Sequence, residues 1–232
     1  MKISSFVNPF VDWRAYICEF FGTFVIVVIS GGTLLANKFW GELGALGVAL
    51  SFGLVVAVAM YSTIHISGAH LNPAITLSLW LSGKMKTFQA VMYILFQIAA
   101  SFAAAVTLLY IFGSRAIDFS LGAPSIGAGV SFQSAVVVEA LATAFLVFAY
   151  FATIVDKKGP ISFGPLVVGL AVLVSVLFSY SISGGSLNPA RVVGPLSLIY
   201  KWDDLILYII GASGGSLFGI VYDFLFLKKS KK

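Results

Sequence analysis

The sequence predicts an all-α membrane protein with six transmembrane helices and two re-entrant half-helices, arranged as an inverted repeat of three plus three spans. Composition is the first indication: of 232 residues, 59% are hydrophobic and 10% charged, and the mean hydropathy is +1.02. Soluble domains carry roughly 25% charged residues. The second indication is a repeat: SGAHLNPA at residues 67–74 returns 116 positions later as SGGSLNPA at residues 183–190, with six of eight residues unchanged.

Six long stretches of the chain are almost free of charge. They cover residues 15–36, 43–66, 87–112, 131–155, 161–182 and 205–226. Each reaches the length of about 20 residues that a helix needs to cross the hydrocarbon core. The first stretch is too long for a signal peptide and contains Glu19, so we expect it to be retained as a span.

Each copy of the repeated segment predicts the start of a short helix. Asn72 precedes Pro73 and Asn188 precedes Pro189; Asn is a good helix cap, and Pro is favoured at the first helical position. The roughly ten apolar residues that follow would reach ~15 Å, half of a ~30 Å core. Non-helical backbone at that depth must be buried in protein or line a cavity.

The two halves of the chain are predicted to have opposite orientations. Glu19 with Thr23 is echoed by Glu139 with Thr143, and three spans per half place the second half upside down in the membrane. We therefore divide one domain, residues 1–232, into repeat one (13–112), a connecting loop (113–130), repeat two (131–227) and a basic tail (228–232). The two half-helices should meet near the midplane.

The net charge of +5 follows the topology and does not indicate a nucleic-acid site. The basic residues of one side are Lys2, Arg14, Lys84, Lys86, Lys157, Lys158, Lys228, Lys229, Lys231 and Lys232, against Lys38, Arg115 and Lys201 on the other. The positive-inside rule then predicts a multi-pass protein of the cell membrane with both termini in the cytoplasm.

Paired Asn-Pro-Ala boxes in two short helices resemble those of the aquaporin, or major intrinsic protein, family. The boxes are Asn72, Pro73, Ala74 and Asn188, Pro189, Ala190, and Arg191 follows the second box. The resemblance extends from about Trp13 to Leu227. It implies the aquaporin fold, a homotetramer with one pore in each subunit, and a passive channel that excludes protons and ions.

The resemblance also implies an aromatic/arginine selectivity filter made of Phe52, Val176, Gly185 and Arg191. Strict water channels of the family typically carry His at the position of Val176 and often Cys at that of Gly185. The wider ring expected here resembles that of broad-selectivity, archaeal members, which suits water and small neutral solutes such as glycerol, ammonia, hydrogen sulfide or carbon dioxide. Dedicated glycerol channels commonly carry Asp where Val192 stands, which argues against that class. A main role in passing glycerol or dissolved gases remains the alternative, because the expected ring is wide.

Buried polar residues complete the expected site. The resemblance places Glu19 and Glu139 behind the half-helix loops as acceptors of backbone N–H groups, and His70 near the cytoplasmic mouth. Buried acids in inverted repeats also occur in proton-coupled secondary transporters, which is the alternative from another class, and a closed structural pore is a third. Gln97, with Tyr93 and Ser101 at helical spacing, should hydrogen-bond across helices.

Other functions find no support in the residues. The chain has no phosphate-binding glycine loop and no plausible catalytic triad, so we expect no enzymatic activity and no cofactor. Its two histidines make a weak metal site. The one cysteine, Cys18, lies within a span, and residues 222–224 most simply form an interfacial anchor. The expected partners are the permeating solutes and membrane lipid.

Overall fold

The computed structural model describes residues 13–227, so Lys2 and the predicted basic tail at 228–232 lie outside the described residues. The first half consists of α1 (Trp13–Trp40), α2 (Gly44–Ser67), α3 (Pro73–Leu81) and α4 (Thr87–Phe112). The second half consists of α6 (Phe132–Tyr150) with η3 (Phe151–Val155), η4 (Ile161–Phe163), α7 (Gly164–Ser179), α8 (Ala190–Leu198), α9 (Trp202–Ser216), α10 (Phe218–Tyr222) and η5 (Asp223–Leu227).

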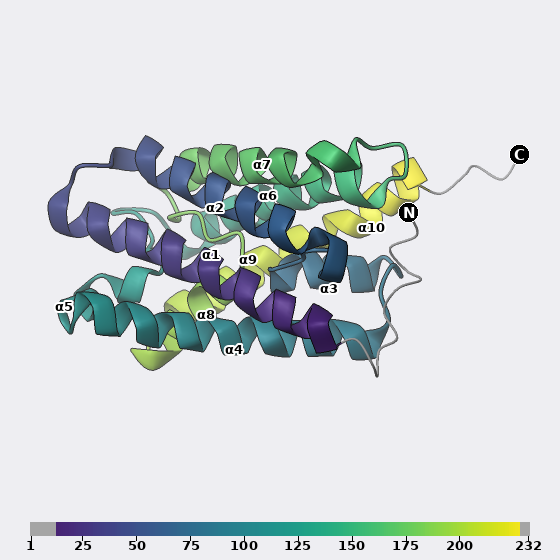
Figure 1. The fold of residues 1–232 in the computed structure, drawn as a ribbon. Helices are drawn as coiled ribbons and strands as arrows, with labels where there is room; N and C mark the ends of the chain where they lie inside the picture. Colours follow the sequence, from purple (N-terminus) through teal and green to yellow (C-terminus); the bar gives the residue numbers. More distant parts are fainter. Residues whose placement is uncertain (1–12, 228–232) are drawn as a thin grey trace, which may run out of the picture.

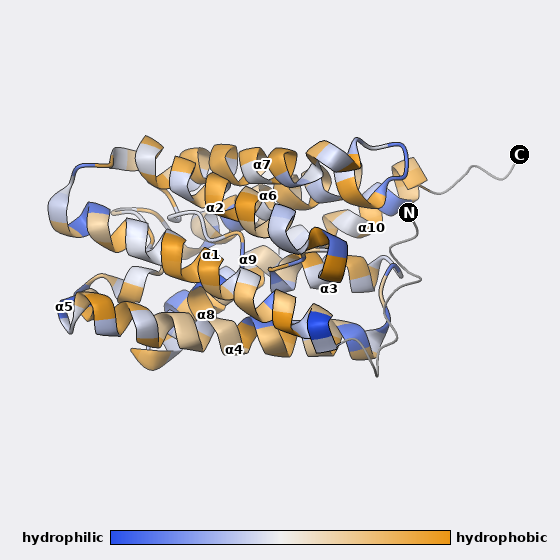
Figure 2. Cartoon of the chain, in the orientation of Figure 1, coloured by the Kyte–Doolittle hydropathy of each residue, from blue (hydrophilic) through white to orange (hydrophobic). Residues whose placement is uncertain are grey.

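Six apolar helices of the described chain are long enough to cross a membrane, as predicted. They are Trp13–Trp40, Gly44–Ser67, Thr87–Phe112, Phe132–Val155, Ile161–Ser179 and Trp202–Leu227. Figure 2 shows hydrophobic residues along the bodies of the helices and most hydrophilic residues near the two ends of the bundle. The apolar outer surface that results suits a hydrocarbon environment.

The short helices α3 and α8 contain nine residues each and enter the bundle from opposite ends (Figure 1). Helix α3 packs against α4 of its own half and α9 of the other half, and α8 packs against α9 and α4. Each half-helix therefore packs against one helix of its own half and one helix of the other half. This is the inverted arrangement that the repeated sequence predicts.

The two halves meet along α2 and α7. A Cβ atom on Gly53 would lie 2.5 Å from the carbonyl oxygen of Gly169, and a Cβ on Gly169 would lie 2.5 Å from the carbonyl oxygen of Gly53. Only glycine fits at both positions, which agrees with the role of small residues in close helix contacts within membranes.

The predicted connecting loop at residues 113–130 is partly helical. It contains α5 (Arg115–Asp118) and η2 (Ser120–Gly122), and Leu121 is buried. The backbone N–H of Gly127 donates to the carbonyl oxygen of Ile182 at 2.9 Å. The linker thus packs against the segment that leads into α8, because its backbone groups find partners there.

Candidate functional site

The two Asn residues of the repeated segments start the half-helices in the same way. The side-chain oxygen of Asn72 accepts the backbone N–H of Ala74 at 2.8 Å, and that of Asn188 accepts the N–H of Ala190 at 2.9 Å. Each amide thereby satisfies a backbone donor that has no partner within its helix.

The amide nitrogens of these residues link the two half-helices at their starts. Asn72 Nδ2 donates to the carbonyl oxygen of Leu187 at 3.0 Å, and Asn188 Nδ2 donates to that of Leu71 at 3.0 Å. An amide nitrogen carries two hydrogens, so one hydrogen of each side chain remains for the cavity that both residues line. Two helix N-termini and two amide donors therefore meet at one point.

The loops before α3 and α8 have the same unusual backbone. Left-handed conformations occur at Gly68, Ala69 and Leu71 in the first loop and at the matching Gly184, Gly185 and Leu187 in the second. Non-glycine residues adopt this conformation at a cost. The surroundings must therefore hold these loops in place.

Glu19, fully buried on α1, holds the first loop. One carboxylate oxygen accepts Ser67 Oγ at 2.7 Å and the N–H of His70 at 3.0 Å, and the other accepts the N–H of Leu71 at 2.6 Å and Gln97 Nε2 at 2.8 Å. Four donors offset much of the cost of burying this carboxyl group.

Glu139, on α6, has the corresponding position in the second half. It accepts Ser183 Oγ at 2.6 Å and the N–H of Leu187 at 2.9 Å, and the N–H of Ser186 lies 2.9 and 3.1 Å from its two oxygens. Both acids thus accept hydrogen bonds from donors of the loop in their own half.

The four residues proposed as a filter lie together. Arg191 Nη1 donates to the carbonyl oxygen of Gly185 at 2.6 Å, and Arg191 Cζ lies 3.9 Å from the centroid of the Phe52 ring, a cation–π geometry. A Cβ on Gly185 would lie 3.2 Å from Val176 Cα. Arg191 Nη2 has no hydrogen-bond partner within residues 13–227. This nitrogen is itself buried, although Arg191 is one of the residues that line the cavity.

A cavity is lined by Phe52 and Arg191 of this cluster and by the Asn pair, whereas Val176 and Gly185 are not among its lining residues. It offers about 30 Å³ to the centres of water molecules, where one water needs roughly 10–15 Å³. Its wall contains Phe52, His70, Asn72, Asn188 and Arg191, with apolar side chains of α2, α6 and α7, and no acidic residue. The site therefore combines fixed donors with an apolar surface.

Some site residues escaped the sequence analysis. Ser30 Oγ accepts Arg191 Nε at 3.1 Å, and a lone serine in an apolar span carries no signal for such a role. Ser67 and Ser183 belong to the repeated segment, so the sequence shows that they are equivalent. It does not show that their hydroxyls bind Glu19 and Glu139. Thr76 Oγ1 contacts both His70 and Gln97.

The cross-helix bonding predicted for the fourth helix is confirmed. Gln97 binds Glu19, Tyr93 OH donates to the carbonyl oxygen of Ser67 at 2.7 Å, and Ser101 Oγ accepts the N–H of Gly194 at 2.7 Å. No cluster of metal-ligating side chains occurs among the residues described.

Comparisons with known proteins show the family of the chain. Residues 6–222 match the model of the family described as "Major intrinsic protein". The chain is 37% identical to Aquaporin TIP4-4 of Zea mays, covering 92% of this chain and 87% of the relative. It is 35% identical to Aquaporin Z of Photorhabdus laumondii, covering 93% and 99%, and 35% identical to the lens fiber major intrinsic protein of Lithobates pipiens, covering 97% and 85%.

A solved structure supports the fold. The aquaglyceroporin from Plasmodium falciparum superposes with a TM-score of 0.79 at 24% identity, covering 91% of this chain and 96% of that one. With the family model matched over residues 6–222, the chain belongs to the major intrinsic protein family.

Proposed function

We propose that the protein is a passive channel for water and small neutral solutes, including glycerol, in the cell membrane. The observation that carries this proposal is the meeting of Asn72 and Asn188 at the cavity, each with one amide hydrogen left over after binding the opposite loop. Two helix N-termini oppose cations there, and the donors bind a passing oxygen without capturing it by charge.

The filter is proposed to be Phe52, Val176, Gly185 and Arg191. The guanidinium adds a positive charge beside the cavity, which opposes protons and other cations. Val176 and Gly185 leave room for solutes larger than water. The resemblance supports a homotetramer with one pore per subunit.

The distribution of charge supports both termini in the cytoplasm. Arg14, Lys84, Lys86 and residues 157–158 lie at the ends of helices that share one end of the bundle, which is the end where α1 begins (Figure 1). Lys38, Arg115 and Lys201 lie at the opposite end. The excess of basic residues marks the cytoplasmic side.

Stopped-flow light scattering on proteoliposomes tests the proposal. We expect fast shrinkage in an impermeant osmolyte and fast re-swelling in glycerol, without proton current at neutral pH. Arg191→Val should keep water flow and admit protons, because it removes the charge beside the cavity. Absence of both solute fluxes, or proton current through the unmodified protein, would refute the channel proposed here.

The alternative of a proton-coupled transporter requires a carboxylate that is free to exchange protons with the cavity. Glu19 and Glu139 instead bind loop donors and do not line the cavity. A flux driven by a pH gradient that disappears in both Glu19→Gln and Glu139→Gln, with folded protein retained, would favour that alternative.

A further inference from the structure

His70 lies on the cavity wall with one ring nitrogen bound to protein. Its Nδ1 lies 3.1 Å from Thr76 Oγ1, and the hydrogen bonds among residues 13–227 include none to Nε2. Tyr93 and Tyr150 pack edge-on against the ring. Their hydroxyls donate to the carbonyl oxygens of Ser67 and Gly68, so neither hydroxyl has a hydrogen left to donate to His70.

The amide of Gln97 has a fixed orientation. Glu19 already accepts three hydrogen bonds from the loop, so the side chain that faces its remaining lone pair must be a donor. Gln97 therefore presents Nε2, at 2.8 Å from Glu19 and 3.1 Å from Thr76 Oγ1. Because Nε2 carries only hydrogens to donate, Thr76 Oγ1 accepts one of them.

The hydroxyl of Thr76 then has a single hydrogen and two remaining neighbours. The carbonyl oxygen of Asn72, four residues earlier, lies 3.2 Å away and only accepts. If the hydroxyl donated to His70 Nδ1 instead, two acceptor oxygens would face each other at that distance. All three contacts are satisfied only when the hydroxyl donates to Asn72 and His70 Nδ1 carries its own hydrogen.

We propose that Thr76 and Gln97 fix His70 as the Nδ1–H tautomer, so that Nε2 is a hydrogen-bond acceptor facing the cavity. Thr76 and Gln97 are thus positioning residues. A water that turns its oxygen to Asn72 and Asn188 points its hydrogens outward, and His70 Nε2 accepts one on the α3 side. The site thereby favours neutral solutes that carry a donor as well as an acceptor. This role in transport rests on the channel function, whereas the tautomer does not.

Nitrogen-15 solid-state NMR of histidine-labelled protein in lipid vesicles tests the tautomer directly. His65→Gln removes the other histidine, and a buffer near pH 8 keeps an ordinary imidazole neutral. We expect the protonated ring nitrogen to be Nδ1, although free histidine in water prefers Nε2–H. A spectrum with Nε2–H in the otherwise unmodified protein overturns the proposal, whether or not the vesicles transport water.

Two substitutions of Thr76 test the positioning role. Thr76→Val removes the hydroxyl and should shift His70 toward Nε2–H, with a roughly two- to tenfold fall in water permeability, as expected for one lost hydrogen bond. Thr76→Ser retains the hydroxyl and should restore both the tautomer and the permeability. An unchanged tautomer in Thr76→Val overturns the assignment of Thr76. A changed tautomer with unchanged permeability overturns the role of His70 in transport and leaves the channel function intact.

Discussion

The two re-entrant loops, residues 67–74 and 183–190, share their backbone and differ in what they present to the cavity. Left-handed residues occupy matching positions, and the backbone of each loop donates hydrogen bonds to one buried Glu. The amide nitrogen of each Asn donates to a carbonyl oxygen of the opposite loop at 3.0 Å. The neighbouring side chains do not match. At equivalent positions, 116 apart, the first half has His70, Ile75 and Thr76, and the second has Ser186, Arg191 and Val192.

This comparison distinguishes the residues that support the two loops from the side chains that differ on the cavity wall. The repeated Glu and Asn residues hold the loops, and the Asn pair also lines the cavity. The other polar side chains on the cavity wall differ between the two halves. The cavity wall contains the imidazole of His70, which precedes α3, and the guanidinium of Arg191, which belongs to α8. One duplicated scaffold therefore supports two different solute contacts in series, and variants of matched residues can test this division.

The largest expected effect separates Glu19→Gln from Glu139→Gln. In the first loop each oxygen of Glu19 accepts a backbone N–H, so an amide –NH₂ leaves one buried donor unpaired wherever it points. In the second loop the –NH₂ can donate to Ser183 Oγ while the remaining oxygen accepts the N–H groups of Ser186 and Leu187. Glu19→Gln should therefore be less stable by about 1–3 kcal/mol.

Denaturant unfolding of the two variants in one detergent measures this difference. The unmodified protein and the double variant serve as references. Equal stabilities, or a weaker Glu139→Gln, would show that the two carboxylates do not support their loops as the hydrogen bonds indicate.

The sequence predicted the parts of the fold that depend on composition and repetition. Hydropathy located the six spans, and the repeated Asn-Pro pairs located the half-helices, because capping is a local property. The prediction that the two half-helices meet near the midplane followed from the odd number of spans in each half and from the length of the half-helices. The resemblance, and not the residues alone, implied the contacts of Glu19 and Glu139 and the grouping of Phe52 with Arg191.

Other features depend on contacts between distant segments. The left-handed conformation of Ala69 and Leu71 could not be predicted from the sequence, because glycine is the residue that normally indicates a left-handed backbone. The bond from Asn72 to Leu187 joins residues 115 apart. Residues 222–224 were interpreted as an interfacial anchor, whereas Asp223 forms an ion pair that no local pattern reveals.

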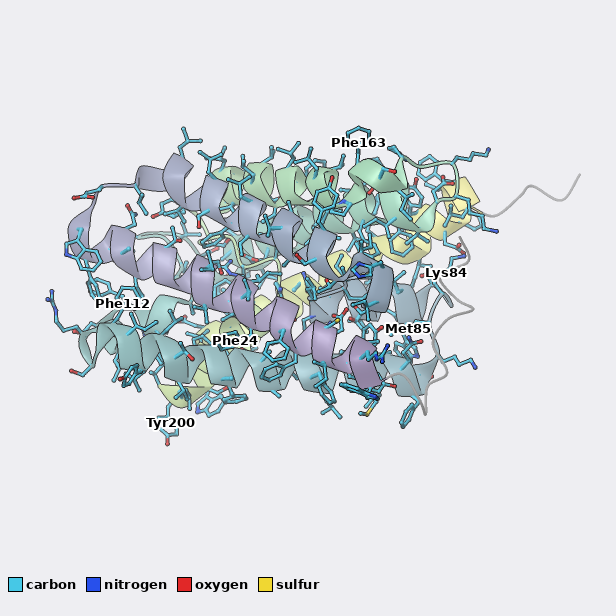
Figure 3. All side chains as sticks on the ribbon, viewed as in Figure 1. Phe24, Lys84, Met85, Phe112, Phe163 and Tyr200 are labelled. Atoms are coloured by element: carbon cyan, nitrogen blue, oxygen red, sulfur yellow. The ribbon has the colours of Figure 1, made fainter. Side chains whose placement is uncertain are left out.

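That ion pair is a smaller asymmetry between the halves. Lys84, which follows α3, lies with its Nζ 2.6 Å from Asp223 Oδ1, at the end of the bundle where α10 ends (Figure 3). The equivalent residue after α8 is Tyr200, which is 77% exposed and lies toward the other end. Lys84→Met should lower stability by up to about 1 kcal/mol, because partly exposed pairs contribute little.

Thermal unfolding at low and high salt checks this expectation, since screening weakens such a pair. Lys86→Met is the matched control, because Lys86 is exposed and forms no ion pair within the described chain. An effect of Lys84→Met no larger than that of Lys86→Met would show that the ion pair does not contribute to stability.

The smallest expected effect is on mercury sensitivity, where the halves differ at Ala69 and Gly185. Cys18 does not line the cavity, so mercuric ions should leave the water permeability of the unmodified protein unchanged. Gly185 is left-handed, and a Cβ there would lie 2.6 Å from Ser179 Oγ, so Gly185→Cys is best combined with Ser179→Ala. Mercuric ions should lower the water permeability of that double variant by binding Cys beside Arg191. They should not affect the control variant Ser179→Ala. Block of the unmodified channel that survives Cys18→Ser would mean that mercury acts elsewhere than on a thiol, and would remove this argument for the position of residue 185.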